Sequence, residues 1–140
     1  MTPHKEKIRS EFVKEWMDKA EEDFSLAEHL AAEKASYYAA IGFHAQQAAE
    51  KYLKAFLVDR QIEFPETHDL AELLDRVSAV NASLAESLNE ITVLTSYGVD
   101  TRYPADLPEI SSDEAGMAVE LAKRVRDAVI LAMIKDQEKR

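Results

Sequence analysis

Apolar residues recur through most of this chain at the spacing that places them on one face of an α-helix. The first stripe runs from Ile8 through Phe12 to Leu30, and the second runs from Ile41 to Leu57. Only 3 glycines and 4 prolines interrupt 140 residues, which favours long helices over strands and turns. The pattern predicts helices over about residues 5–33, 36–60, 69–80 and 83–96, and a last helix towards the end of the chain. Ser36 is expected to cap the second helix and Ser112 the last one. In the fourth helix, the residues expected to face the core are Leu84, Leu88, Ile91, Val93 and Leu94.

Two segments break the helical pattern. Pro65, in QIEFPETHDL, disfavours helix in the residues just before it, and Thr67 is placed to cap the next helix. The stretch YGVDTRYPADLPEISS, residues 97–112, holds one glycine and two prolines and predicts a loop. We therefore expect an all-α fold, an up-and-down four-helix bundle with an additional short helix, formed as one domain by residues 1–140.

Composition narrows the classes of function. Asp and Glu number 27 against 17 Lys and Arg, and the net charge of −10 opposes non-specific binding to nucleic acid backbones, so we expect no DNA binding. A small positive pocket is compatible with that charge, because salt screens charges beyond roughly 8–10 Å. No apolar run is long enough to span a membrane, residues 1–12 lack the apolar core of a signal peptide, and cysteine is absent. These features predict a cytoplasmic protein with no membrane association.

A file of polar residues runs through the second predicted helix. His44, Gln47, Lys51 and Lys54 are spaced three, four and three positions apart, so they share one helical face. A solvated surface is the simplest explanation of such a face, and a pair of Glu50 with Lys54 along the helix would account for part of it. The mixture of His and amide groups, on a helix apolar enough to be central, favours a partly enclosed site. We interpret the file as one wall of a shallow ligand pocket.

Two other segments supply the remaining candidate residues. His68, in THDL, either caps its own turn or serves as an acid–base group close to Lys51 or Lys54. Arg102 and Tyr103, in TRYP, combine a guanidinium suited to phosphate with a ring suited to stacking on a base, although Arg102 would equally well fasten the loop to an acidic helix. The four histidines lack zinc-binding spacing and no phosphate-loop or dinucleotide motif is present, so we expect no metal and no cofactor.

The order of these motifs resembles the HEPN domain family. The resemblance is carried by Trp16 and Asp23 in W-x6-D, then by QQAAEKYLKAFL, FPETHDL and TRYP, and it spans roughly residues 10 to 135. It implies a small helical bundle, usually a homodimer, often encoded beside a minimal nucleotidyltransferase in pairs similar to toxin–antitoxin systems. It also implies a nucleotide-binding role, and many members of the family cleave RNA without a metal.

The ribonuclease relatives carry an Arg followed four to six residues later by a His, and this chain departs from that pattern. No His follows Arg102 within range, and seven residues separate Arg60 from His68. The absence of the motif argues against an enzyme and favours nucleotide binding or an accessory role beside a nucleotidyltransferase. One alternative is a metal-independent ribonuclease that uses His68 and Arg102, and another is an interaction module without a ligand. A partner nucleotidyltransferase would find acceptors for modification in Tyr97 or Tyr103.

Overall fold

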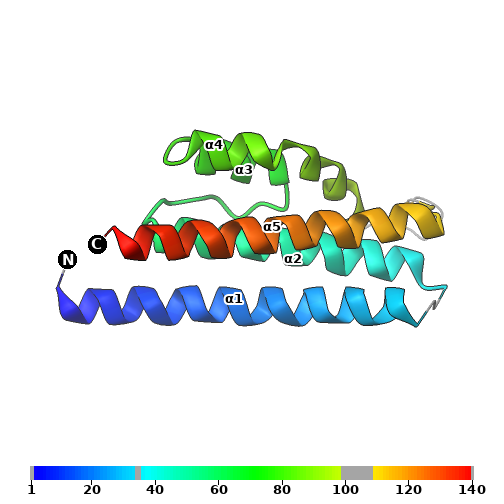
Figure 1. Cartoon of the computed structure of the whole chain (residues 1–140), viewed down its shortest axis with the longest axis horizontal. Helices are drawn as coiled ribbons and strands as arrows, with labels where there is room; N and C mark the ends of the chain where they lie inside the picture. Colours follow the sequence, from blue (N-terminus) through cyan, green and yellow to red (C-terminus); the bar gives the residue numbers. More distant parts are fainter. Residues whose placement is uncertain (1, 34–35, 99–108, 140) are drawn as a thin grey trace.

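The computed structural model describes residues 2–33, 36–98 and 109–139, and these form helices and no strands. In Figure 1, three long helices run side by side, and the shorter helices form a return leg along one side of them. Because α1 begins and α5 ends at the same end of the molecule, the all-α up-and-down bundle expected from the sequence is confirmed. The helices are α1 (Pro3–Ala32), α2 (Tyr38–Asp59), α3 (Leu70–Ser78), α4 (Ala82–Ser87), the 3-10 helix η1 (Asn89–Gly98) and α5 (Ser112–Glu138).

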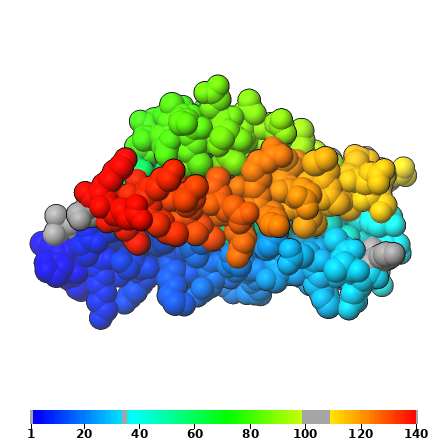
Figure 2. All heavy atoms as spheres, viewed as in Figure 1, coloured from blue at the N-terminus to red at the C-terminus, as the bar shows by residue number. Residues whose placement is uncertain are grey.

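The central helix is α2, which packs against α1, α5, α3 and η1. On the face drawn in Figure 2, α5 lies between α1 and the layer of α3 and α4. Small residues on α2 let its neighbours approach closely, and a Cβ added to Gly42 would lie 2.8 Å from Cδ1 of Ile110. Four polar or charged residues of α2 are buried with its apolar face: Gln46, Glu50, Lys54 and Asp59. The expectation that this helix is central, with part of its polar face enclosed, is confirmed.

The apolar stripe of α1 is buried only in its second half. Ala20, Phe24 and Ala27 are buried, whereas Ile8 and Phe12 are 39% and 52% exposed. The guanidinium of Arg9 donates to the carbonyl of Asp59, the last residue of α2, so the first turns of α1 extend past the end of its partner helix. On these turns Arg9 and Val13 are partly buried, so the inward face of α1 passes through their positions and leaves Ile8 and Phe12 on a side that faces solvent.

The prediction that one continuous helix spans residues 83–96 is wrong. The helix α4 ends at Ser87, and the chain continues as a 3-10 helix. Hydroxyls of Ser87, Thr92 and Ser96 each donate to the carbonyl three residues earlier, which competes with α-helical bonding. A helix with three residues per turn aligns Leu88, Ile91 and Leu94, all buried, and turns Val93 outward to 58% exposure. The prediction that Val93 faces the core is therefore also wrong.

Three predicted helix caps are displaced by one or two residues. The side chain that caps α3 is that of Asp69, which accepts from the backbone of Ala71, while Thr67 accepts from Asp69 itself in the preceding turn. The cap of α5 is Ser111, in a reciprocal capping box with Glu114, instead of Ser112. The expected cap at Ser36 is also wrong, because the N-cap of α2 is Tyr37 and makes no side-chain hydrogen bond.

The end of α2 is a Schellman motif that turns the chain back along the same helix. The amide of Ile62 donates to the carbonyl of Leu57, and the amide of Gln61 donates to that of Val58. The residue in the left-handed conformation is Gln61, with φ of 59°. Pro65 disfavours helix at Phe64, and the return segment, residues 61–69, holds no helix. It lies beside α2, because His68 is bonded to Gln46 and Glu50 of that helix. Among the described helices, none has the length and apolar character required to cross a membrane.

Candidate functional site

The polar file of α2 does not act as one face in the structure, because its members bind partners on two different elements. His44 and Lys51 contact Asp23 of α1. Lys54 instead binds Glu50, which also holds His68 from the return segment. The helical spacing that suggested a single wall thus separates into two clusters, each organised by a carboxylate.

The first cluster centres on the buried carboxylate of Glu50. Its Oε1 lies 2.8 Å from Nδ1 of His68, and its Oε2 accepts from Nζ of Lys54 at 2.9 Å. The side chains of Glu50 and Lys54 are 4% and 8% exposed, whereas that of His68 is 70% exposed. Since Nδ1 faces a carboxylate, it carries the hydrogen, and Nε2 is the ring nitrogen left for other partners. The cluster therefore holds the imidazole of His68 in a defined orientation at the surface, and the ion pair of Glu50 with Lys54 that orients it is buried.

Two glutamines complete this cluster. The amide nitrogen of Gln46 donates to Oε1 of Glu50 at 3.1 Å and to the carbonyl of His68 at 3.3 Å. Its amide oxygen accepts from Gln47 at 2.8 Å. Gln46 is fully buried, so it ties α2 to the return segment and fixes the carboxylate at the same time. The candidate Gln47 acts here as support for Gln46.

Aromatic rings surround the ammonium group of Lys54. Its Nζ lies 5.4 Å from the ring centroid of Trp16 and 5.8 Å from that of Phe64, within the range of cation–π attraction. The two rings meet edge to face, with centroids 6.3 Å apart. Three elements build this corner of the molecule, because Trp16 belongs to α1, Lys54 to α2 and Phe64 to the return segment.

The second cluster joins α1 to α2 through Asp23. One carboxylate oxygen lies 2.9 Å from Nδ1 of His44, and the other accepts from Nζ of Lys51 at 2.5 Å. All three side chains are partly buried. Each of the two carboxylates thus binds one His and one Lys, and the charge of both candidate lysines is already balanced within the chain.

The remaining candidates lie where the described chain stops. Arg102 and Tyr103 are outside the described residues. The preceding residues are placed: a Cβ added to Gly98 would lie 2.3 Å from Oε1 of Gln46, so the end of η1 packs directly on the buried cluster. Burial and the neighbouring carboxylate of Glu114 raise the pKa of Tyr97.

Sequence reasoning found the His and Lys members of both clusters but missed the residues that organise them. Glu50 was recognised only as a helix-stabilising neighbour of Lys54, and that ion pair is confirmed. Asp23 lies seven residues after Trp16, on the side of α1 that faces α2, and an acidic residue on that side was a signal for a buried partner. An oriented imidazole beside a carboxylate can accept or donate a proton and can hydrogen-bond a phosphate oxygen.

A small helical bundle with a buried ionic cluster along its central helix is the class of protein that the fold and the site define. The sequence matches the HEPN domain family over residues 13–136, and the chain belongs to this family. It is similar to the crystal structure of TT1696 from Thermus thermophilus, with 28% identity, a TM-score of 0.67, and coverage of 84% of this chain and 94% of that one.

A second solved structure, ST0689, described as an archaeal HEPN homologue, shares the fold. Its identity to this chain is 22% and its TM-score is 0.66, with 86% of this chain and 97% of that chain covered. No curated protein matches the sequence.

Proposed function

We propose that this HEPN domain protein binds a phosphate-containing ligand, a nucleotide or RNA, at the surface where His68 emerges, and that it is the accessory partner of a minimal nucleotidyltransferase. The two would form a two-gene, toxin–antitoxin-like system. Family membership supports the proposal, since such domains are often encoded beside these enzymes.

The observation that carries the proposal is the exposed imidazole held on a buried carboxylate. Glu50 is fixed by Gln46 and Lys54, so the ring of His68 has a defined orientation although most of it is in solvent. Nε2 is then placed to bond a ligand oxygen without a rearrangement of the chain. Phe64, four residues earlier in the same segment, offers aromatic surface against which a base can stack.

The ion pairs define which cations are available to a phosphate. Lys51 is bound to Asp23 and Lys54 to Glu50, so neither is a free positive charge. Binding therefore depends on His68 and on Arg102, whose side chain lies outside the described residues. A site with so few cations suits one or two phosphates better than a long polyanion.

The net charge of the chain supports the accessory role. A chain with net charge −10 attracts a more basic protein, and association of that kind is accelerated by complementary fields. We expect the acidic chain to act as a homodimer, and we expect Tyr97 or Tyr103 to be the acceptor if the partner transfers a nucleotidyl group to it.

The test is calorimetric titration of the protein with ATP, GTP and a short RNA, with the RNA examined on a gel afterwards. Saturable binding with intact RNA, weakened by about tenfold in His68→Ala, supports the proposal, because one charge-assisted hydrogen bond is worth about 1.5–3 kcal/mol. The matched control is His29→Ala, which removes another exposed histidine bonded to a glutamate, Glu33. Equal loss in both variants would contradict a specific role for His68.

A metal-independent ribonuclease is the second candidate, and the same pair of residues favours it. A carboxylate that orients an imidazole is the arrangement used in general acid–base catalysis. RNA cleavage that persists in EDTA and is lost in His68→Ala would establish this activity and displace the binding role. If neither binding nor cleavage occurs, the remaining function is an interaction module, and co-purification with a minimal nucleotidyltransferase would test that.

A further inference from the structure

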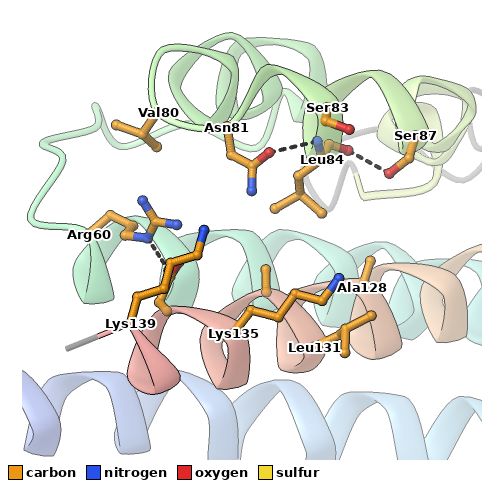
Figure 3. A pocket seen from close by; sticks show the side chains of 12 residues that line it. Arg60, Val80, Asn81, Ser83, Leu84, Ser87, Ala128, Leu131, Lys135 and Lys139 are labelled. Carbon is orange, nitrogen blue, oxygen red and sulfur yellow. Dashed lines mark hydrogen bonds and ion pairs between the residues drawn. The ribbon is translucent and has the colours of Figure 1, made fainter.

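A separate cleft lies between the last turns of α5 and the turn that joins α3 to α4. Its volume is about 670 Å³, within the range of small-molecule sites. Figure 3 shows it from close by: Arg60 and Lys139 lie at one end, below Val80 and Asn81. None of the residues in the two carboxylate clusters described above lines this cleft.

The cleft is positively charged on an acidic protein. Arg60 is bound to Asp136, so that pair is neutral. Lys135 and Lys139 lie one turn apart on the same side of α5, and neither has an acidic partner among the described residues. Among the exposed lysines of the described chain, Lys14 and Lys19 have such partners, so what distinguishes Lys135 and Lys139 is that they line one cleft together. Two like charges that share one cleft favour a ligand carrying two negative charges.

The uncharged part of the cleft combines apolar side chains with three polar ones, Asn81, Ser83 and Ser87. Leu131 and Ala128 of α5 face Leu84 of α4 across it in Figure 3. Leu131 is 52% exposed, so its side chain has free surface to offer a ligand. On the opposite wall, the side-chain oxygen of Asn81 accepts from the backbone of Leu84, while its amide nitrogen points into the cleft. Apolar side chains from two helices therefore lie next to the lysines, and the ammonium group of Lys135 ends beside Ala128 in Figure 3.

We propose that this cleft binds a small phosphomonoester whose organic part is apolar or aromatic. A phosphomonoester carries about −1.5 to −2 charges at pH 7, which matches the two unpaired lysines, whereas a carboxylate or sulfate ester supplies only one. The phosphate lies between Lys135, Lys139 and the amide of Asn81, and the organic part covers Leu131. The site is independent of His68 and of the function proposed above.

A structural explanation of the lysines exists and makes a different prediction. Cations in the last turn of a helix interact favourably with the partial negative charge at its C-terminus. If that were the whole role of Lys135 and Lys139, their replacement by glutamine would lower the stability of the helix end and would leave ligand binding unaffected. Affinity and thermal stability must therefore be measured on the same variants.

The experiment is titration of the ¹⁵N-labelled full chain with three probes: phenyl phosphate, phenyl sulfate and inorganic phosphate. We expect phenyl phosphate to shift amide signals in residues 80–87 and 131–139 and to bind about tenfold more tightly than either of the others, because each lacks one charge or the apolar group. Equal binding of phenyl sulfate, or shifts centred on other residues, would overturn the proposal. So would the absence of saturation up to about 10 mM, beyond which a site contributes little.

Variants locate the interaction. Lys135→Gln combined with Lys139→Gln is expected to weaken phenyl phosphate about tenfold or more, and Leu131→Gln is expected to weaken it without changing the binding of inorganic phosphate. The matched control is Lys123→Gln, an exposed lysine of α5 that does not line the cleft. In His68→Ala, the amide signals of residues 80–87 and 131–139 should titrate with phenyl phosphate as in the unmodified chain, because none of them belongs to the site proposed at His68. Unchanged affinity in the double lysine variant would overturn the assignment.

Discussion

The Oε1 of Glu50 lies 2.8 Å from Nδ1 of His68, and these two residues connect the most buried ionic group of the central helix to the surface. The connection depends on the return segment, which lies beside α2 after its C-terminal turn. An exposed ring thereby acquires a fixed orientation from a carboxylate that is 4% exposed. The side chain of Glu50 therefore contributes both to the stability of the fold and to the orientation of the His68 imidazole.

Replacement of one member of the buried ion pair should destabilise the fold strongly. Glu50→Gln leaves the ammonium of Lys54 buried without a counter-charge, and we expect the free energy of unfolding to fall by about 3–5 kcal/mol. Combining Glu50→Gln with Lys54→Met should restore most of that loss, because a buried pair replaced as a whole by uncharged groups is often nearly neutral. Urea unfolding of the single variant, the double variant and the unmodified protein measures both effects.

The control for this prediction is an ion pair of similar length at the surface. Arg124 and Glu90 lie 3.1 Å apart and are 47% and 71% exposed, so Glu90→Gln should cost about 0.5 kcal/mol or less. A loss of the same small size in Glu50→Gln would mean that the Glu50 carboxylate is hydrated and does not hold Lys54 in a low-dielectric environment.

The φ of Gly98 is not positive, so its backbone conformation does not by itself require glycine. What requires glycine at this position is the lack of space for a side chain. A Cβ there would meet the buried side chain of Gln46 at 2.3 Å, so Gly98→Ala should destabilise the protein by about 1–3 kcal/mol and disturb the Glu50 cluster. Gly116→Ala is the matched variant: no atom of the described residues lies within 4 Å of its added Cβ, and an exposed helical glycine replaced by alanine should gain about 0.5–1 kcal/mol.

Thermal unfolding of the two alanine variants should therefore move in opposite directions. In Gly98→Ala, the amide signal of His68 should also shift, since Gln46 bonds its carbonyl. A stable Gly98→Ala variant with an unchanged His68 signal would show that Gln46 can move aside without cost.

The long helices of this fold could be predicted from the sequence because their apolar period is sustained over many turns. The same reasoning failed for residues 83–96, where Leu84, Leu88 and Ile91 fit an α-helix but hydroxyls bond carbonyls three residues back. Helix periodicity alone does not separate a 3-10 turn from an α-turn over so short a stretch. Val93 was misplaced for that reason.

The candidate site could be predicted only as a helix face. Spacing correctly placed Lys51 and Lys54 near one another along α2 and indicated Glu50 as the partner of Lys54. The partner of Lys51 could not be chosen from a local pattern, because it belongs to another helix. Asp23 is 28 residues before Lys51 in the chain. The site residues other than Arg102 and Tyr103 are thus located by the structure, while their role in ligand binding stays a prediction.

The left-handed residue at the end of α2 offers a way to stabilise the return segment. Gln61 has φ of 59°, a conformation that costs a residue with a side chain roughly 1–2 kcal/mol. Gln61→Gly should raise the free energy of unfolding by about 0.5–1 kcal/mol, a smaller figure because glycine has greater freedom in the unfolded chain. Gln61→Ala keeps the strain and should give little change. Destabilisation by glycine would mean that the Gln61 side chain makes a stabilising contact.

Tyr52 should make the stability of the protein fall at alkaline pH. Its hydroxyl donates to Glu21 at 2.8 Å, and burial, followed by this bond, raises the pKa of Tyr52 far above its ordinary value of 10.0. Above pH 10 the unfolded chain releases the tyrosine proton while the folded chain retains it, so the unfolded state binds fewer protons and stability decreases as pH rises. The contribution is about 1.4 kcal/mol per pH unit.

Tyr52→Phe removes this dependence and leaves the four other tyrosines in place. At pH 8 the variant should be less stable by about 1 kcal/mol, because it lacks the hydrogen bond to Glu21, which keeps its bond to Arg126. As pH rises from about 10 to 11, the difference should shrink and then reverse, because only the protein with Tyr52 loses stability through this group. The urea unfolding midpoints of Tyr52→Phe and of the unmodified protein, measured across that pH interval, test this prediction. Parallel curves for the two proteins would mean that Tyr52 ionises in the folded state as readily as in the unfolded chain.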